Sequence, residues 1–303
     1  MRLFRGVLLF FLLAALPTRA QSPDGVPQVL ASIRPVHSIA AAVMAGAGTP
    51  DLLIAGGASP HAYALRPSDA AKLARAEIVF WIGPALETFL EAPLESLAPD
   101  AATIALMDAD GLTRLPVRQG GLWEDEQGEE PGPTDAHVWL DPRNGAAMAW
   151  TMAEALAAAD PGRARLYRNN AGALAARLEA QEAVLRSRLA GIAGRPYVVF
   201  HDAYQYFEAR YALSPLGSVS VAADRPVGMG RVLAVRARIR QTPAICVFAP
   251  PQFSPALLTA LTEGADARRA ILDDLGTELE PGPALYEALM VRLADAFFSC
   301  LGG

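Results

Sequence analysis

Short catalytic motifs are missing from this 303-residue sequence, and histidine, cysteine and lysine are scarce. It has no H-E-x-x-H pair, no G-x-S-x-G elbow and no P-loop. A Gly-rich dinucleotide turn is also absent, because "PVGMGRV" (226–232) lacks the third glycine. These absences remove support for the commonest hydrolase and nucleotide-binding classes. Only four histidines are present, and they lie too far apart in the chain for a local zinc finger.

The composition is that of a globular protein, with 52% apolar, 7% aromatic and 19% charged residues. The first twenty residues are separate in character: Arg2 and Arg5 precede an apolar run at 6–16, and a small residue, Ala20, ends the segment. This pattern predicts a secretory signal peptide at 1–20, because the run is too short to span a bilayer. No cysteine follows the cleavage site, so a lipid anchor is not supported.

Cleavage removes three arginines and no acid, so the net charge falls from −6 to −9. An acidic exported protein is a poor candidate for binding nucleic acid or anionic lipid. We therefore expect a periplasmic protein without membrane insertion after cleavage. Export also favours a disulfide between the only two cysteines, Cys246 and Cys300. Two separate buried thiols, or metal ligation by both, are the alternatives.

Apolar, strand-like runs alternate with helix-like stretches along the mature chain. The runs are residues 28–33, 50–56, 77–83, 102–108, 137–141, 196–202, 214–221, 244–250 and 269–276. This alternation is typical of α/β units on parallel sheets. It is interrupted at 144–192, where a helix ending near Asp160 and a Pro-Gly break precede a long helix of about eight turns. A strandless stretch between two α/β halves predicts two Rossmann-like lobes joined by a rigid helix.

The expected organisation is an N-terminal lobe at 21–160, a linking helix at 161–192 and a C-terminal lobe at 193–303. Within the first lobe, residues 118–135 are rich in glycine, proline and acidic residues, which predicts a solvated loop. This acidic loop is either an inert insertion or a weak carboxylate site for divalent cations.

Each histidine lies at one end of an apolar run, and in open α/β sheets ligands bind where the carboxyl ends of strands converge. The histidines are His37, His61, His137 and His201. Asp273 and Asp274 follow a further run and offer a carboxylate. The fold would have to bring such residues together, with two candidates before the long helix and two after it. A zinc hydrolase would need an open coordination position and a general base, which a complete four-residue shell does not leave.

Four motifs together resemble the ZnuA-type zinc-binding proteins of bacterial ABC importers, within the manganese and zinc cluster. They are "GASPHAYALRPSD" (57–69), "HVWLDPRN" (137–144), "VVFHDAYQYF" (198–207) and "LDDLGTE" (272–278). The resemblance implies two α/β lobes joined by one long helix, with a metal held between them and passed to a membrane permease. It covers essentially the whole mature chain.

Position by position, the resemblance implies that His61, His137 and His201 are metal ligands. Asp273 matches the fourth ligand of many members, whereas others have a different donor or water in that place. Cys246 and Cys300 match a disulfide of this family. The acidic loop 118–135 stands where many members have a His-rich loop, and His37 lies outside the matched set. Asp141, Asp202 and Arg66 lie near ligands in sequence and are candidates for orienting imidazoles, although Asp141 is also placed to cap a helix.

Three imidazoles and one carboxylate suit tetrahedral Zn(II), whereas manganese prefers more oxygen ligands. The sequence is therefore interpreted as a zinc-capturing solute-binding protein, a monomer that is not an enzyme and whose partner is an ABC permease. The alternatives are a manganese-binding protein of the same class, a secreted zinc-dependent hydrolase, and a surface adhesin.

Overall fold

The structure is a computed structural model that describes residues 25–118, 123, 134–220, 227–242, 245–252 and 255–302. The predicted signal peptide at 1–20 lies outside these residues, as does most of the predicted acidic loop 118–135. Within the described ranges, no helix combines the length and the apolar character needed to cross a membrane.

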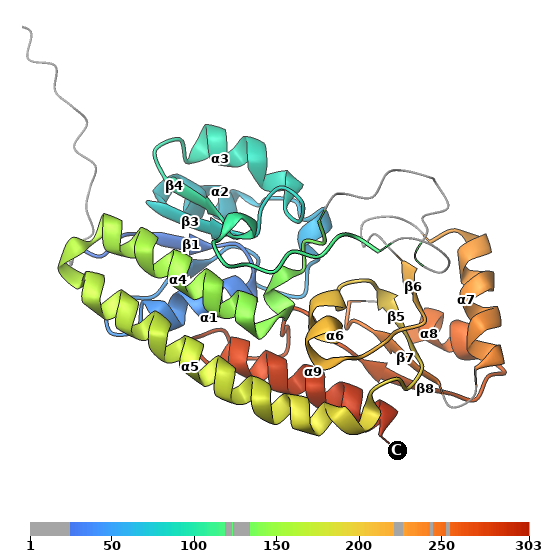
Figure 1. The fold of residues 1–303 in the computed structure, drawn as a ribbon. Helices are drawn as coiled ribbons and strands as arrows, with labels where there is room; N and C mark the ends of the chain where they lie inside the picture. The colour runs from blue at the N-terminus through green and yellow to red at the C-terminus, as the bar shows by residue number, and fades with distance from the viewer. Residues whose placement is uncertain are drawn as a thin grey trace, which may run out of the picture.

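Two four-stranded parallel sheets form the framework, one in each half of the chain (Figure 1). The first has the order β2-β1-β3-β4 and the second the order β6-β5-β7-β8. The strands are β1 (Val29–Ala31), β2 (Asp51–Leu52), β3 (Ile78–Trp81), β4 (Ala102–Ala105), β5 (Tyr197–His201), β6 (Gly217–Ser220), β7 (Ile245–Ala249) and β8 (Ala267–Ile271). In both orders the chain switches sides about an inner strand, which confirms two lobes of doubly wound type.

Helices cover the sheets, so the inner strands are largely apolar. Every residue of β3, β5 and β7 is buried. The first lobe has α1 (Arg34–Val43), α2 (Pro67–Arg75) and α3 (Glu91–Leu97), and the second has α6 (Gln205–Tyr211), α7 (Met229–Gln241), α8 (Pro255–Thr262) and α9 (Leu285–Leu301). Continuous apolar runs in the sequence therefore did mark these strands.

One predicted strand is wrong. The run 137–141 forms a single 3-10 turn, η5 (Val138–Leu140), followed by α4 (Pro142–Ala159). All three residues of η5 are buried, so their apolar character reflects burial in the core rather than pairing in a sheet. Asp141 begins α4, where its carboxylate accepts a hydrogen bond from the backbone of Arg143 at 2.9 Å.

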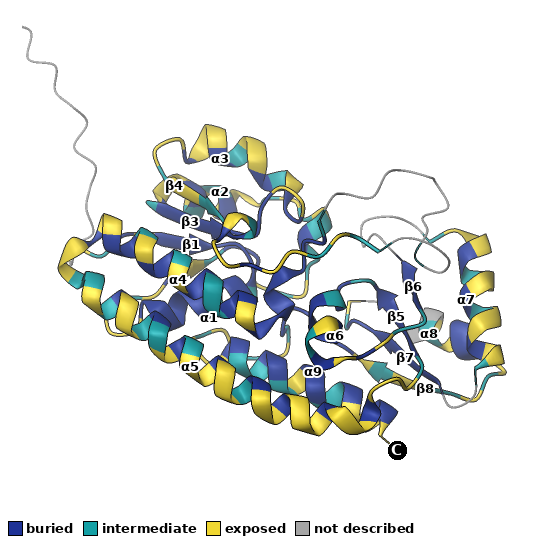
Figure 2. Ribbon diagram, viewed as in Figure 1, coloured by how far each residue is buried: buried dark blue, intermediate teal, exposed yellow. Residues whose placement is uncertain are grey.

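The long helix predicted between the lobes is present as α5 (Ala164–Leu189), which has 26 residues and a length of about 39 Å. Short 3-10 turns flank it, η6 (Pro161–Arg163) and η7 (Ala190–Ile192). Its buried residues recur every three or four positions, and Figure 2 shows the opposite face exposed. The buried face of α5 packs on α4 and α9, so α5 links elements of both lobes along the molecule.

The helix α9 forms a second connection between the lobes. The sequence did not predict this connection. α9 lies beside α5 and also contacts α1 of the first lobe (Figure 1). In its first turn, the Tyr286 hydroxyl donates to the carbonyl oxygen of Trp139 at 2.6 Å, and the Tyr286 amide donates to Ser38 Oγ at 2.9 Å. A side chain at Gly145 would place its Cβ 2.3 Å from the Tyr286 hydroxyl, so this close approach requires glycine.

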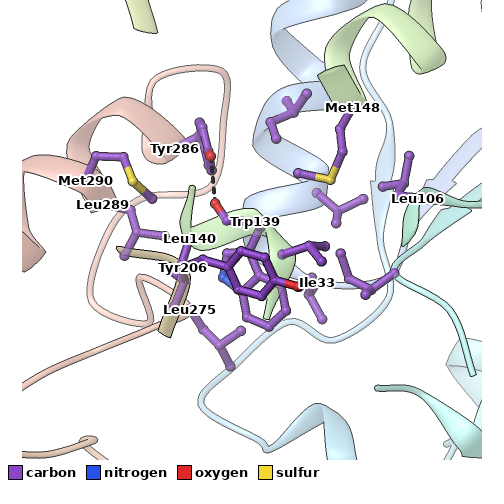
Figure 3. Close-up of a cluster of buried hydrophobic side chains, with 14 of the residues drawn as sticks. Ile33, Leu106, Trp139, Leu140, Met148, Tyr206, Leu275, Tyr286, Leu289 and Met290 are labelled. Atoms are coloured by element: carbon purple, nitrogen blue, oxygen red, sulfur yellow. Dashed lines mark hydrogen bonds between the residues drawn. The ribbon is translucent and has the colours of Figure 1, made fainter. Parts of the chain in front are cut away.

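The largest hydrophobic core runs through both lobes. In Figure 3, Ile33 and Met148 from the first half of the chain share one cluster with Tyr206 and Leu289 from the second. A smaller cluster lies on the other side of the second sheet, beneath α7 and α8. Because interiors are close-packed, a shared core opposes wide hinge motion between the lobes.

Cys246 of β7 and Cys300 of α9 are joined by a disulfide across 54 residues of sequence. This confirms the predicted bond. It attaches the C-terminal helix to the second sheet.

Candidate metal centre

His61 is presented by a short turn that follows the first lobe's edge strand, β2. The turn is the 3-10 element η1 (Pro60–Ala62), whose first residue is a proline with its backbone preset for that position. Ser59 precedes it, and the Ser59 hydroxyl accepts a hydrogen bond from the His61 amide at 3.3 Å. Proline and serine thus fix the backbone that carries the imidazole, which is half-buried.

His137 and His201 come from the two halves of the chain. His137 is the residue before η5, and His201 is the last residue of the buried inner strand β5. Both side chains are buried. The carboxyl end of β5 lies at the point where the second sheet changes winding direction, which is the usual position of a ligand site in this architecture.

The three imidazoles converge. His137 Nε2 lies 3.3 Å from His61 Nε2 and 3.1 Å from His201 Nε2, and all three ligand atoms lie within 4.8 Å of one another. Two nitrogens bound to one zinc ion at about 2.0–2.1 Å and the tetrahedral angle are about 3.3 Å apart. The two distances from His137 therefore match those of nitrogens sharing a zinc ion, and the third pair lies within 4.8 Å.

Burial favours the neutral imidazoles that a metal needs. It lowers the pKa of His61 to about 3, with the neighbouring His137 adding to the effect. Burial also lowers the pKa of His201 well below its usual range, again with help from His137. Two of the three imidazoles are therefore neutral across the physiological pH range.

The pKa of His137 shifts in the opposite direction, because a carboxylate lies against the Nδ1 atom of its ring. Asp135 Oδ1 lies 2.8 Å from His137 Nδ1 and also accepts a hydrogen bond from the His137 amide at 3.0 Å. Burial by itself lowers the pKa of His137, but the Asp135 carboxylate outweighs it and the pKa is raised. With Nδ1–H donating to Asp135, the Nε2 lone pair faces the other two imidazoles.

Asp135 was not among the residues proposed from sequence to orient the imidazoles. Of those, Asp141 caps α4 and pairs with Arg210, so its alternative role as a cap is the one observed. Asp202 forms an ion pair with Arg118 at 3.0 Å, and burial raises the pKa of its carboxyl to about 7 despite that partner. The backbone of Arg66 donates to Asp69 at the start of α2.

Asp273 does not join the three-histidine group in this structure, since the described side chains that make up the group are the histidines alone. Its carboxylate instead accepts hydrogen bonds within its own turn. They come from the amides of Leu275, Gly276 and Thr277 at 3.1, 3.0 and 2.6 Å, and from the Thr277 hydroxyl at 2.8 Å. To ligate a metal, Asp273 would have to give up these contacts.

The loop that carries Asp273 is itself fixed by the surrounding core. Arg34 of the first lobe donates to the carbonyl oxygens of Gly276 and Leu279. Trp139 donates its indole N–H to the Asp274 carbonyl oxygen at 2.8 Å. The fourth histidine, His37, lies away from the group, with its Nε2 3.1 Å from the carbonyl oxygen of Pro50.

The sequence of this chain is similar to that of known proteins along nearly its whole length. The family model described as "Zinc-uptake complex component A periplasmic" (ZnuA) matches residues 29–300. The chain is 38% identical to the high-affinity zinc uptake system protein ZnuA of Brucella abortus (strain 2308), over 90% of this chain and 91% of that one. It is 35% identical to the protein of the same name from Paracoccus denitrificans (strain Pd 1222), over 95% of each chain.

Solved structures show the same fold. A crystal structure of a ZnuA deletion mutant with zinc bound aligns with a TM-score of 0.75 and 24% identity, covering 89% of this chain and 98% of that one. The solute-binding protein FpvC of Pseudomonas aeruginosa in complex with Mn²⁺ aligns with a TM-score of 0.76 and 19% identity, over 91% and 98% of the two chains. The family match over residues 29–300, supported by relatives above 30% identity, shows that this chain belongs to the ZnuA family of periplasmic zinc-uptake components.

Proposed function

We propose that this protein captures Zn²⁺ in the periplasm and passes it, as a monomer, to the membrane permease of an ABC importer. The observation that supports this most directly is the convergence of three Nε2 atoms from His61, His137 and His201 at the spacing of a shared zinc ion. Two of these ligands precede the long helix and one follows it, so a bound ion is the cargo held between the lobes. The predicted signal peptide and the family's description support the compartment.

The donor set favours zinc over manganese. Zinc accepts imidazole nitrogen readily at low coordination number, whereas manganese sites are usually richer in oxygen and have more ligands. The names of the curated relatives point the same way, because each is a high-affinity zinc uptake protein.

The binding site is tested by metal analysis of the purified protein, with competition between zinc and manganese. One equivalent of zinc that excess manganese does not displace is the expected result. Separate alanine substitutions at His61, His137 and His201 should each weaken zinc binding strongly. His37→Ala is the matched control, because His37 is also a partly buried histidine of the first lobe but lies outside the group. Zinc affinity that survives all three ligand substitutions would overturn the proposal.

Asp273 is proposed as the fourth ligand, joining the site when its turn opens. The test is Asp273→Asn, because asparagine retains an acceptor oxygen for the turn but is a much weaker zinc ligand than a carboxylate. We expect a clear loss of zinc affinity with little change in the stability of the metal-free protein. Unchanged affinity would assign the fourth position to water.

A further inference from the structure

Tyr206 has a buried hydroxyl that bridges the two lobes beside the metal centre. It lies on α6 of the second lobe, and its side chain is almost fully buried. The hydroxyl donates to the carbonyl oxygen of Asp135 at 2.8 Å and accepts from the amide of Leu115 at 3.0 Å. Both partners belong to the first lobe. Their two chain segments are joined by a hydrogen bond from the Asp135 amide to the Leu115 carbonyl oxygen.

The Tyr206 hydroxyl is linked to the ligand His137 through a single intervening residue, Asp135. Tyr206 fixes the backbone of Asp135, and the Asp135 side chain holds both the amide and the Nδ1 atom of His137. A continuous set of hydrogen bonds therefore runs from α6 to the imidazole that occupies the middle of the three-histidine group.

α6 is also tied to another ligand, His201. Only three residues separate His201, at the end of β5, from the start of α6, and the amide of Ala203 donates back to the His201 carbonyl oxygen at 3.0 Å. His201 and Tyr206 thus belong to one rigid strand–helix unit. The Tyr206 hydroxyl therefore connects His137, the ligand from the first lobe, to the unit that carries His201, the ligand from the second lobe.

We propose that Tyr206 is a positioning residue for metal binding, which holds His137, through Asp135, in register with His201 before the metal arrives. This proposal rests on the proposed function, because it concerns the affinity of the same site. It adds that part of the zinc affinity comes from a bridge between lobes that touches neither the metal nor an imidazole.

The direct test is Tyr206→Phe, which keeps the ring in the core and removes only the hydroxyl. The loss of a single neutral hydrogen bond predicts zinc binding about fivefold weaker, expressed mainly as faster release to a chromophoric chelator. Tyr211→Phe is the matched control. Tyr211 is on the same helix and is also buried, but its hydroxyl has no hydrogen-bond partner among the described residues.

A double-mutant cycle separates positioning from general destabilisation. Asp135→Ala alone should weaken zinc binding by about 10- to 100-fold, the usual effect of losing a partner that orients a metal ligand. If Tyr206 acts through Asp135, adding Tyr206→Phe to Asp135→Ala should change affinity by less than about twofold. A second readout is the ¹⁵N spectrum of the histidine rings in the metal-free protein, where Tyr206→Phe should reduce the Nδ1–H form of His137.

The outcomes distinguish the two claims. A wild-type protein that binds one zinc, with a Tyr206→Phe variant indistinguishable from Tyr211→Phe, refutes the positioning role and leaves the function intact. Equal effects of Tyr206→Phe with and without the Asp135 side chain also refute it, because the hydroxyl would then act independently of the carboxylate that holds His137. A wild-type protein that does not bind zinc refutes the function itself.

Discussion

Glu87 has a buried carboxyl group. Ionising this group inside the protein is unfavourable, so we expect a loss of stability as pH rises. Its side chain has no exposed surface, and its Oε2 atom accepts hydrogen bonds from the amides of Ile82 and Gly83 at 2.8 and 3.1 Å. Burial raises the pKa of this carboxyl to about 7, although the Ser32 hydroxyl and the two amides lower it in part. The folded state therefore retains a proton that the unfolded chain loses near its ordinary pKa of 4.5.

The sign and size of the effect follow from linkage. Below pH 4.5 the carboxyl is protonated in both states and has no effect on the pH dependence. Between pH 4.5 and 7 the folded state binds more protons, so the free energy of unfolding falls as pH rises. A shift from 4.5 to about 7 corresponds to about 3 kcal/mol, which is fully lost above pH 7.

Glu87→Gln removes the ionisation and keeps an oxygen for the two amides. We expect the variant to exceed the wild type in unfolding free energy by up to about 3 kcal/mol at pH 8, with the gap nearly closed at pH 4.5. Urea titrations of the metal-free, disulfide-intact protein at both pH values measure this gap. Glu95→Gln, at an exposed position of α3, is the control and should show no such gap. A gap for Glu87→Gln that does not vary with pH would refute the reasoning.

Three further predictions concern the site and its supports. Zinc affinity should fall as pH drops through the pKa of His137, which lies above its usual value of 6.5. Roughly one proton should be released per zinc, because His137 is the imidazole for which protons compete; calorimetry in buffers of different ionisation enthalpy counts the protons, and release of three would contradict this. Reducing the Cys246–Cys300 bond should lower the unfolding free energy by about 4 kcal/mol, measured by urea titration with and without reductant. Asp141→Ala should cost about 3 kcal/mol of stability, because it removes the two-bond partner of Arg210 and leaves that guanidinium only a 3.9 Å contact with Glu182. Zinc affinity should stay within about threefold of wild type, and a large selective loss of affinity would instead make Asp141 part of the site.

The sequence predicted the inner strands well, because strands covered on both faces need unbroken apolar runs. It was less accurate at the partly exposed edge strand β8, which spans 267–271 rather than the predicted 269–276. The apolar run at 137–141 was wrongly predicted as a strand, because it is also buried. Val138 and Leu140 are apolar because they lie in the core, and a run of this length does not distinguish a strand from a tight turn. The contact of α9 with the first lobe had no local signal, since it depends on tertiary packing.

For the metal centre, the histidines were found because they are rare and lie at the ends of apolar runs. Asp135 was missed, although its position two residues before His137 is the spacing at which an aspartate side chain bonds the backbone ahead of it. The contacts of Asp273 were not predictable from its position in the sequence. Sequence places it after β8 but does not reveal that its carboxylate is already occupied by the turn that follows.

The C-terminal helix has a consequence for how the protein matures. α9 contributes Tyr286 to the contact with the first lobe, Leu289 to the shared core and Cys300 to the disulfide. α9 follows all eight strands in the chain, so both sheets are synthesised before it. A chain truncated before α9 would therefore leave the apolar interior of both lobes uncovered, and proteases would encounter an incomplete molecule rather than a functional first lobe.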